Sequence, residues 1–286
     1  MKNDFLFDWK SMDPEAKLGV PAKKFTGVNS FWAFFLGLVF TTIFYGVLYP
    51  FWQFKSIQFI NMFFPGGPEN RSWIPIGTTF LTMWCLAFLL IKWQKIKVQR
   101  KILTLDILPH THGFILSPDN SSVVQSRIDE QVYLANGFIA LNRIQKTLAN
   151  LKNIGRVSDV SSVLNDLALA DEKYLEGTYT LPKGLIWAIP VTGFIGTVLG
   201  LSEAVGGFGK VISSGAGIDT LKQSLSGVTG GLAVAFETTL IALVAALLLQ
   251  LLMTMIMQKE EDLMDDCGNY CYQNIVSKLK MIDMGN

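Results

Sequence analysis

The stretch IPVTGFIGTVLGL, residues 189–201, lies within an uncharged segment, 184–202, whose 19 residues are long enough to cross a bilayer. A plain lipid anchor would be rich in leucine, whereas this stretch carries Pro190, two threonines and three glycines. Its glycines, Gly193, Gly196 and Gly200, recur at three- and four-residue spacing, which places missing side chains on one helix face. The stretch therefore predicts a membrane helix that another helix can approach closely.

Spacing alone leaves two roles open for this face. Thr197 lies on it and serves either as a packing residue bonded to its own backbone or as a polar group lining a path. Pro190 removes one helix hydrogen bond and is expected to bend the span, which occurs in inert and in moving membrane helices alike.

Three further segments predict membrane spans. Thirty residues without a charge separate Lys24 from Lys55, and 20 more fill 72–91 between Arg71 and Lys92. The last segment runs from about Gly227 to Gln258 and is interrupted only by Glu237. The first segment begins far from the N-terminus and lacks a small-residue cleavage site, so we expect it to be retained rather than removed as a signal peptide. With 50% hydrophobic and 16% charged residues, the chain is predicted to be an all-α membrane protein with four transmembrane helices.

The distribution of lysine and arginine predicts the orientation. Residues 92–101 hold five bases and no acid, so the end of the second span is expected inside the cell. With four spans, 20 bases fall on that side and only Lys55, Arg71, Lys210 and Lys222 on the other. Both termini are therefore predicted to be cytoplasmic.

The chain between the second and third spans is patterned like amphipathic helices. Apolar residues follow three- and four-residue spacing in two series, Ile128, Val132, Ala135, Ile139 and Leu141, Ile144, Leu148, Leu151. Residues 108–122 collect Pro, Gly, Ser and Asn and predict a loop. The expected organisation is an N-terminal tail (1–27), helices one and two (28–91), a cytoplasmic helical region (92–183), helices three and four (184–258) and a cytoplasmic C-terminal helix (259–286).

The fourth span, like the third, places small residues around a threonine hydroxyl group. Ala235, Thr239, Ala242 and Ala246 share one narrow face at i, i+4, i+7 and i+11, and Thr238 lies beside it. Two such stripes would together line a path for another helix or for an ion. Glu237 is the ionisable residue inside this span, and a carboxylate there is costly unless it faces protein or water, so we expect a functional role. The simpler alternative is that Glu237 reaches headgroups or water near the outer surface.

Other chemistries find little support. Nucleotide-binding and catalytic signatures are absent from the sequence, so an enzyme is not expected, and neither a cofactor nor nucleic acid is implied. Cys85, Cys267 and Cys271 have neither the count nor the spacing of a disulfide framework or a zinc site. His110 and His112 form a lone HxH in a loop with no cluster of cysteines or acids, so metal binding is not expected there.

The third span resembles the second-to-last membrane helix of the MotA/TolQ/ExbB proton channel proteins, whose pattern is close to A-P-L-L-G-L-L-G-T-V-x-G-I. The proline, three glycines, threonine and valine that match in register are Pro190, Gly193, Gly196, Thr197, Val198 and Gly200. SGVTGGLAVAFETTLIALVAALLL, residues 226–249, is similar to the family's last helix. The resemblance covers about 75 residues, 184–258, and the four-span topology is MotA-like.

The resemblance implies a motor. Five copies, a ring-shaped homopentamer in the bacterial inner membrane, would surround a dimer of a single-span partner similar to MotB, TolR or ExbD, whose membrane helix carries an essential Asp. Ion passage, with protons favoured over sodium, would turn the ring relative to the dimer. Thr197 and Thr239 would face the pore, with Thr238 and Glu237 near the ion path. The face that packs around the partner would hold Pro190, Gly193, Gly196, Gly200, Ala235, Ala242 and Ala246.

The chain departs from the family pattern in two places. ExbB and TolQ usually have a proline after the Ala-rich part of the last helix, where this chain reads ALLLQLL, residues 246–252. Their Glu also stands about five residues before the Thr, whereas Glu237 is two before Thr239, an arrangement closer to the F-[DE]-T-T of the ZorA-like branch. Two other functions stay open at this point, a non-conducting helical scaffold of an envelope complex and a solo transporter with a site at Glu237.

Overall fold

The structure is a computed structural model that describes residues 5–53, 58–65, 72–109, 114–151, 157–213 and 217–279. Its contacts divide the chain into two units. We call Ser30–Leu89 with Leu181–Thr254 the membrane unit, and Met1–Asn29 with Leu90–Thr180 and Met255–Asn286 the polar unit. Each unit is described by itself.

The membrane unit consists of helices, as expected where no water is present to satisfy a free backbone. It contains α2 (Ser30–Gln53), α3 (Gln58–Asn61) and the membrane parts of α4 (Ile74–Lys101), α8 (Thr180–Ser213) and α9 (Ile218–Asn274). Within the described residues, four helices are long and apolar enough to cross a membrane. The chain is therefore a multi-pass membrane protein, as the sequence predicted.

Helix α2 packs against α4 through a missing side chain and a cluster of rings. A Cβ atom added at Gly37 would lie 2.6 Å from the Cα atom of Trp84. The ring of Phe34 meets Trp84 and Phe80 edge-on, with centroids 5.1 and 5.3 Å away. Close approach at a glycine and aromatic contacts hold this pair, because burial of apolar surface gives no driving force within lipid.

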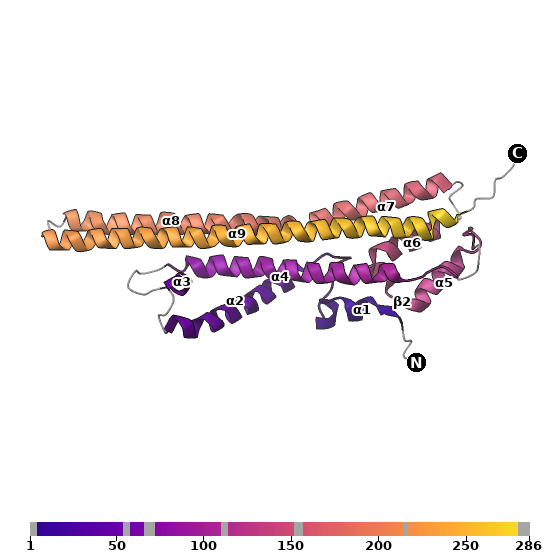
Figure 1. Ribbon diagram of the computed structural model, residues 1–286, viewed down its shortest axis with the longest axis horizontal. Coiled ribbons are helices and arrows are strands. Elements are labelled where there is room, and N and C mark those ends of the chain that lie inside the picture. The colour runs from indigo at the N-terminus through magenta and orange to yellow at the C-terminus, as the bar shows by residue number, and fades with distance from the viewer. Residues whose placement is uncertain are drawn as a thin grey trace. The chain divides into compact units, whose positions relative to one another are not determined.

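The polar unit joins short elements from the N-terminal part of the chain to longer helices. Its elements are β1 (Phe7–Asp8), α1 (Trp9–Met12), η1 (Ala16–Leu18), η2 (Ile102–Thr104), α5 (Ser121–Gln131), β2 (Val132–Tyr133), η3 (Ala135–Gly137), α6 (Ile139–Asn150), α7 (Val157–Gly177) and η5 (Val276–Lys278). The two short strands pair in parallel, Phe7 with Val132 and Asp8 with Tyr133. Helix α6 packs against both α5 and α7 (Figure 1).

The first of the two apolar series, Ile128 to Ile139, does not lie on one helix. Helix α5 ends at Gln131 and α6 begins at Ile139, with β2 and η3 between them. Leu134 adopts a left-handed backbone conformation with φ of 57°, which a continuous helix excludes. The apolar residues of both series are nevertheless buried, so the spacing identified core positions although the first series is divided between two helices.

Residues 5–29, assigned to a tail from the sequence, are packed into the polar unit. The ring of Trp9 covers Gly137, where an added Cβ atom would lie 2.6 Å from it. Lys95 is fully buried and holds the same segment by charge. Its Nζ atom lies 2.6 Å from Glu15 Oε2 and 3.1 Å from Asp13 Oδ2, and it donates to the carbonyl of Gly27 at 2.8 Å.

We predict that Lys95→Met lowers the free energy of unfolding by about 3–5 kcal/mol, because two buried carboxylates lose their counter-charge. The measurement is thermal unfolding of the purified full-length chain in detergent, followed by circular dichroism. Lys97→Met is the matched control, since Lys97 is exposed on the same helix and lies over the ring of Trp93. Equal midpoints for the two variants would contradict the prediction.

Candidate functional site

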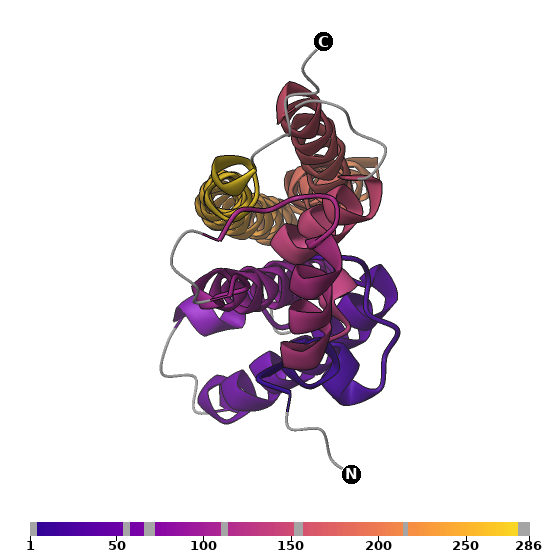
Figure 2. The ribbon, with the colours of Figure 1, turned by 90° about the vertical axis from the view of Figure 1, so that its right-hand side faces the viewer.

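Within the membrane unit, α8 and α9 lie side by side in both views (Figure 1 and Figure 2). Gly193, Gly196 and Gly200 of α8 face α9. An added Cβ atom at Gly193 would lie 2.5 Å from Ala242 Cβ, and one at Gly200 would lie 3.2 Å from Ala235 Cβ. Ala235 and Ala242 are fully buried, so small residues on both helices bring the two backbones together here.

This close approach brings Thr197 and Thr239 into contact. The two hydroxyl groups are within hydrogen-bonding distance of each other, and both side chains are half-buried. Each hydroxyl also reaches across to the other helix, Thr197 to the carbonyl of Ala235 and Thr239 to the carbonyl of Gly193, both at 3.1 Å. The pair therefore closes a small polar ring between two apolar helices.

The ring has two possible arrangements of its protons, because each hydroxyl has one hydrogen to donate. In one, Thr197 donates to Thr239, which donates to the carbonyl of Gly193. In the other, Thr239 donates to Thr197, which donates to the carbonyl of Ala235. Rotation of both hydroxyl groups exchanges the two arrangements without moving a helix.

Thr238 has a different environment. It is buried, its hydroxyl donates to the carbonyl of Ala235 on its own helix at 2.8 Å, and an added Cβ atom at Gly196 would lie 2.7 Å from it. Glu237 is half-buried. The structure thus joins Thr197 to Thr239 and places Thr238 against Gly196. Ala246 is buried farther along α9, and α8 continues through Pro190 without interruption.

A second hydroxyl contact was missed from the sequence. The hydroxyl groups of Thr78 on α4 and Thr192 on α8 lie 3.3 Å apart, and each also donates to a carbonyl of its own helix. Thr192 stands in the stretch that opened the sequence analysis, yet it lies outside the glycine face. The sequence shows a threonine in each of these two spans, but it does not show that the two threonines meet.

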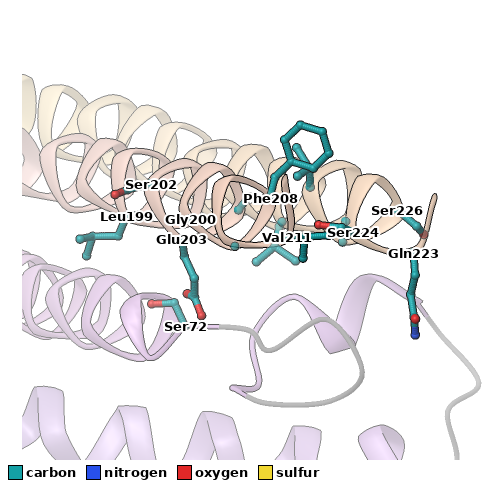
Figure 3. A pocket seen from close by; sticks show the side chains of 18 of the residues that line it. Ser72, Leu199, Gly200, Ser202, Glu203, Phe208, Val211, Gln223, Ser224 and Ser226 are labelled. Atoms are coloured by element: carbon teal, nitrogen blue, oxygen red, sulfur yellow. The ribbon is translucent and has the colours of Figure 1, made fainter. Parts of the chain in front are cut away.

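A cavity of about 1280 Å³ adjoins this region of the membrane unit. Small and polar residues predominate in its lining, among them Ser72, Gly196, Glu203, Gln223, Ser224 and Thr238. Figure 3 shows the carboxyl group of Glu203, from α8, directed toward Ser72, which precedes α4. Thr238 borders the cavity, whereas Thr197 and Thr239 do not, so the hydroxyl pair faces elsewhere.

Metal binding finds no support in the part of the chain that the structure describes. Among these residues no group of three or more His, Cys, Asp or Glu is placed to hold an ion. His110 and His112 lie outside the described residues. Cys267 and Cys271, in the polar unit, are free and buried, and burial raises the pKa of each thiol to about 12, so both stay protonated at neutral pH.

Four apolar helices, two of them in close contact around a hydroxyl pair, define a helical multi-pass membrane protein. Residues 138–268 match the model of the MotA/TolQ/ExbB proton channel family. The match includes α6 and α7 and so extends beyond the span motifs. Searches of curated proteins and of solved structures found no match.

We predict that Gly193→Ala destabilises the contact of α8 with α9 by about 1–3 kcal/mol, because the added methyl group overlaps Ala242. Thermal unfolding in detergent measures the effect. Gly184→Ala is the control, since an added Cβ atom there meets no other atom within 4 Å. Ala242→Gly is expected to restore part of the loss in the double variant. No loss in Gly193→Ala, or no recovery in the double variant, would refute the close contact.

Proposed function

We propose that the chain is the ion-conducting subunit of an inner-membrane motor of the MotA/TolQ/ExbB type, with protons as the ion. The single observation that supports this most is the hydroxyl pair of Thr197 and Thr239, set between helices that match a proton channel family. A channel family of this kind carries out transport rather than catalysis. Both termini are proposed to be cytoplasmic, on the strength of the lysine and arginine distribution.

In the proposed assembly five copies form a ring around two helices of a single-span partner that carries a membrane Asp. The hydroxyl pair would pass a proton to or from that carboxylate. The two proton arrangements support this role. When one hydroxyl accepts a proton and the other releases its own, one arrangement becomes the other, and rotation of both hydroxyl groups restores the first. The small residues of α8, together with Ala235 and Ala242, would hold α8 and α9 of each copy close together while the ring turns against the central helices.

The closest rival is a non-conducting scaffold, in which the same hydroxyl pair only holds α8 to α9. The two functions differ in what they require of the hydroxyl group. A scaffold needs the shape of the side chain and one interhelical hydrogen bond, which is worth about 0.6 kcal/mol in a membrane. Conduction needs a hydroxyl group at each position, because each position must both donate and accept a hydrogen bond.

We predict that Thr197→Val and Thr239→Val each lower proton flux at least tenfold, which corresponds to about 1.4 kcal/mol in the barrier. Flux is measured in vesicles that contain the chain together with its single-span partner, from the decay of an imposed pH gradient. Valine keeps the shape and removes the hydroxyl, whereas Thr→Ser at the same positions should keep the flux. Thr254→Val is the control, because Thr254 is exposed and bonds only to its own helix among the described residues. Full flux in both valine variants would favour the scaffold.

Glu237 is also proposed to lie on the ion path. A carboxylate inside a membrane span costs free energy, and its presence there indicates a function. We predict that Glu237→Gln changes how flux depends on pH, while Glu203→Gln, on α8, leaves that dependence unchanged. The same vesicles are assayed over a series of pH values. Identical pH profiles for Glu237→Gln and the unaltered chain would remove Glu237 from the path. Function of the purified chain without any partner would instead favour a solo transporter.

A further inference from the structure

Helices α7 and α9 border a second cavity, which lies entirely within the polar unit and has a volume of about 350 Å³. We call it the acidic pocket. Five of its nine lining residues are acids, and none of the nine is a base; the acids are Glu172, Glu176, Glu260, Glu261 and Asp265. Leu175, Met257 and Met264 supply apolar wall. The pocket thus combines an apolar floor with a strongly negative rim.

The acidity is concentrated on these two helices. Helix α7 carries five acids and one base, and the segment 259–266 of α9 also carries five acids and one base. Glu172, Glu176, Glu261 and Asp265 are exposed, and none of these four forms an ion pair with any residue that the structure describes. Their mutual repulsion favours a cation in the pocket.

Glu260, the fifth acid, is already neutralised. It is buried, its Oε1 atom lies 3.0 Å from Nζ of Lys92, and it accepts a hydrogen bond from the hydroxyl of Thr26. Lys92 is fully buried too and donates to the hydroxyl of Thr178 at 2.7 Å. Burial lowers the pKa of Lys92, and the nearby Glu260 carboxylate opposes that shift. Lys92 is thus committed to Glu260 and does not offset the charge of the rim.

Tyr179 gives a second, independent observation that points to a ligand in the pocket. Its side chain is buried, it lines the pocket, and its hydroxyl has no hydrogen-bond partner among the described residues. Burial, and then the nearby Glu260 carboxylate, raises the pKa of Tyr179, so the hydroxyl stays protonated. A buried polar group left without a partner costs about 1–3 kcal/mol. A donor entering the pocket would bond to the lone pairs of the hydroxyl oxygen and remove part of that cost.

We propose that the acidic pocket binds a lysine or arginine side chain from the cytoplasmic end of the single-span partner's membrane helix, an inference that rests on the proposed function. The aliphatic part of such a side chain suits Leu175 and the two methionines, and its charged end suits the four carboxylates and the Tyr179 oxygen. A metal ion suits the pocket less well, because its acids are not gathered as ligands among the described residues.

The position along the chain supports this choice of partner. Tyr179 stands five residues before the third predicted span, and Met257 lies at the end of the fourth. Single-span proteins with a cytoplasmic N-terminus carry lysine and arginine at the same level. Anionic lipid headgroups of the cytoplasmic leaflet would be repelled by four carboxylates, so a lipid is not the occupant.

The test places a photo-reactive amino acid at position 172 of the full chain, expressed together with its single-span partner. Glu172 lines the pocket, and its replacement leaves three rim carboxylates. After irradiation, peptide mass spectrometry identifies the attachment point. We expect it within the basic segment that flanks the cytoplasmic end of the partner's helix. Attachment to a second copy of this chain or to lipid, or the absence of any adduct, would overturn the proposal.

A matched pair of variants tests the role of charge. The double variant Glu176→Gln with Glu261→Gln removes two rim carboxylates and should lower the adduct yield at least about fivefold. Asp166→Asn with Asp262→Asn removes the same charge from the same two helices outside the pocket and should leave the yield unchanged. Equal yields for the two would also overturn the proposal, and equal thermal midpoints ensure that folding is not the cause.

These outcomes are distinct from a failure of the proposed function. If the valine variants of Thr197 and Thr239 abolish flux while the adduct maps elsewhere, conduction stands and the pocket does not bind the partner. If the adduct maps to the partner while those variants keep full flux, the docking site belongs to a scaffold instead.

Discussion

The contact of Gly193 with Ala242 is the constraint on which the membrane unit depends, because it sets how closely α8 and α9 approach each other. Lipid tails are as apolar as leucine, so no hydrophobic force holds these helices together within a bilayer. Close packing and interhelical hydrogen bonds must do so, and both require short distances. The hydroxyl pair of Thr197 and Thr239 forms because the glycines, which have no side chains, let each hydroxyl reach a carbonyl of the opposite helix.

The polar unit is stabilised by the burial of apolar residues together with buried charges. Water drives its apolar residues into a core, and buried charges then fix the position of the N-terminal segment. Lys95 binds two acids of that segment, and Glu260 accepts a hydrogen bond from Thr26 of the same segment. Removing one member of such a network leaves a buried charge without a partner, which is far more costly than losing a surface pair. The segment is therefore specified by charge as much as by shape.

The sequence predicted the four spans and the small faces of the last two, because a helix in lipid must be uncharged and its contact face must be small. It also predicted most core positions between residues 128 and 151, which depend on periodicity. It missed the packing of residues 5–29 and the break at Leu134, since both depend on contacts between residues far apart in the chain. The pairing of Thr78 with Thr192 escaped for the same reason, because a threonine in each of two helices does not reveal which of them meet.

The basic residues of segment 92–101 form one sequence pattern but serve two different physical roles. As a topology signal its five bases count equally, and all of them favour the cytoplasm. In the structure Lys92 and Lys95 are buried counter-ions of Glu260, Asp13 and Glu15, while Lys97, Arg100 and Lys101 are exposed. The buried pair therefore offsets acids inside the polar unit and leaves the exposed carboxylates of α7 and α9 without compensation from it. A protein that places bases at one membrane boundary can thus still present a negative surface there, and such a surface attracts the basic flank of another membrane helix.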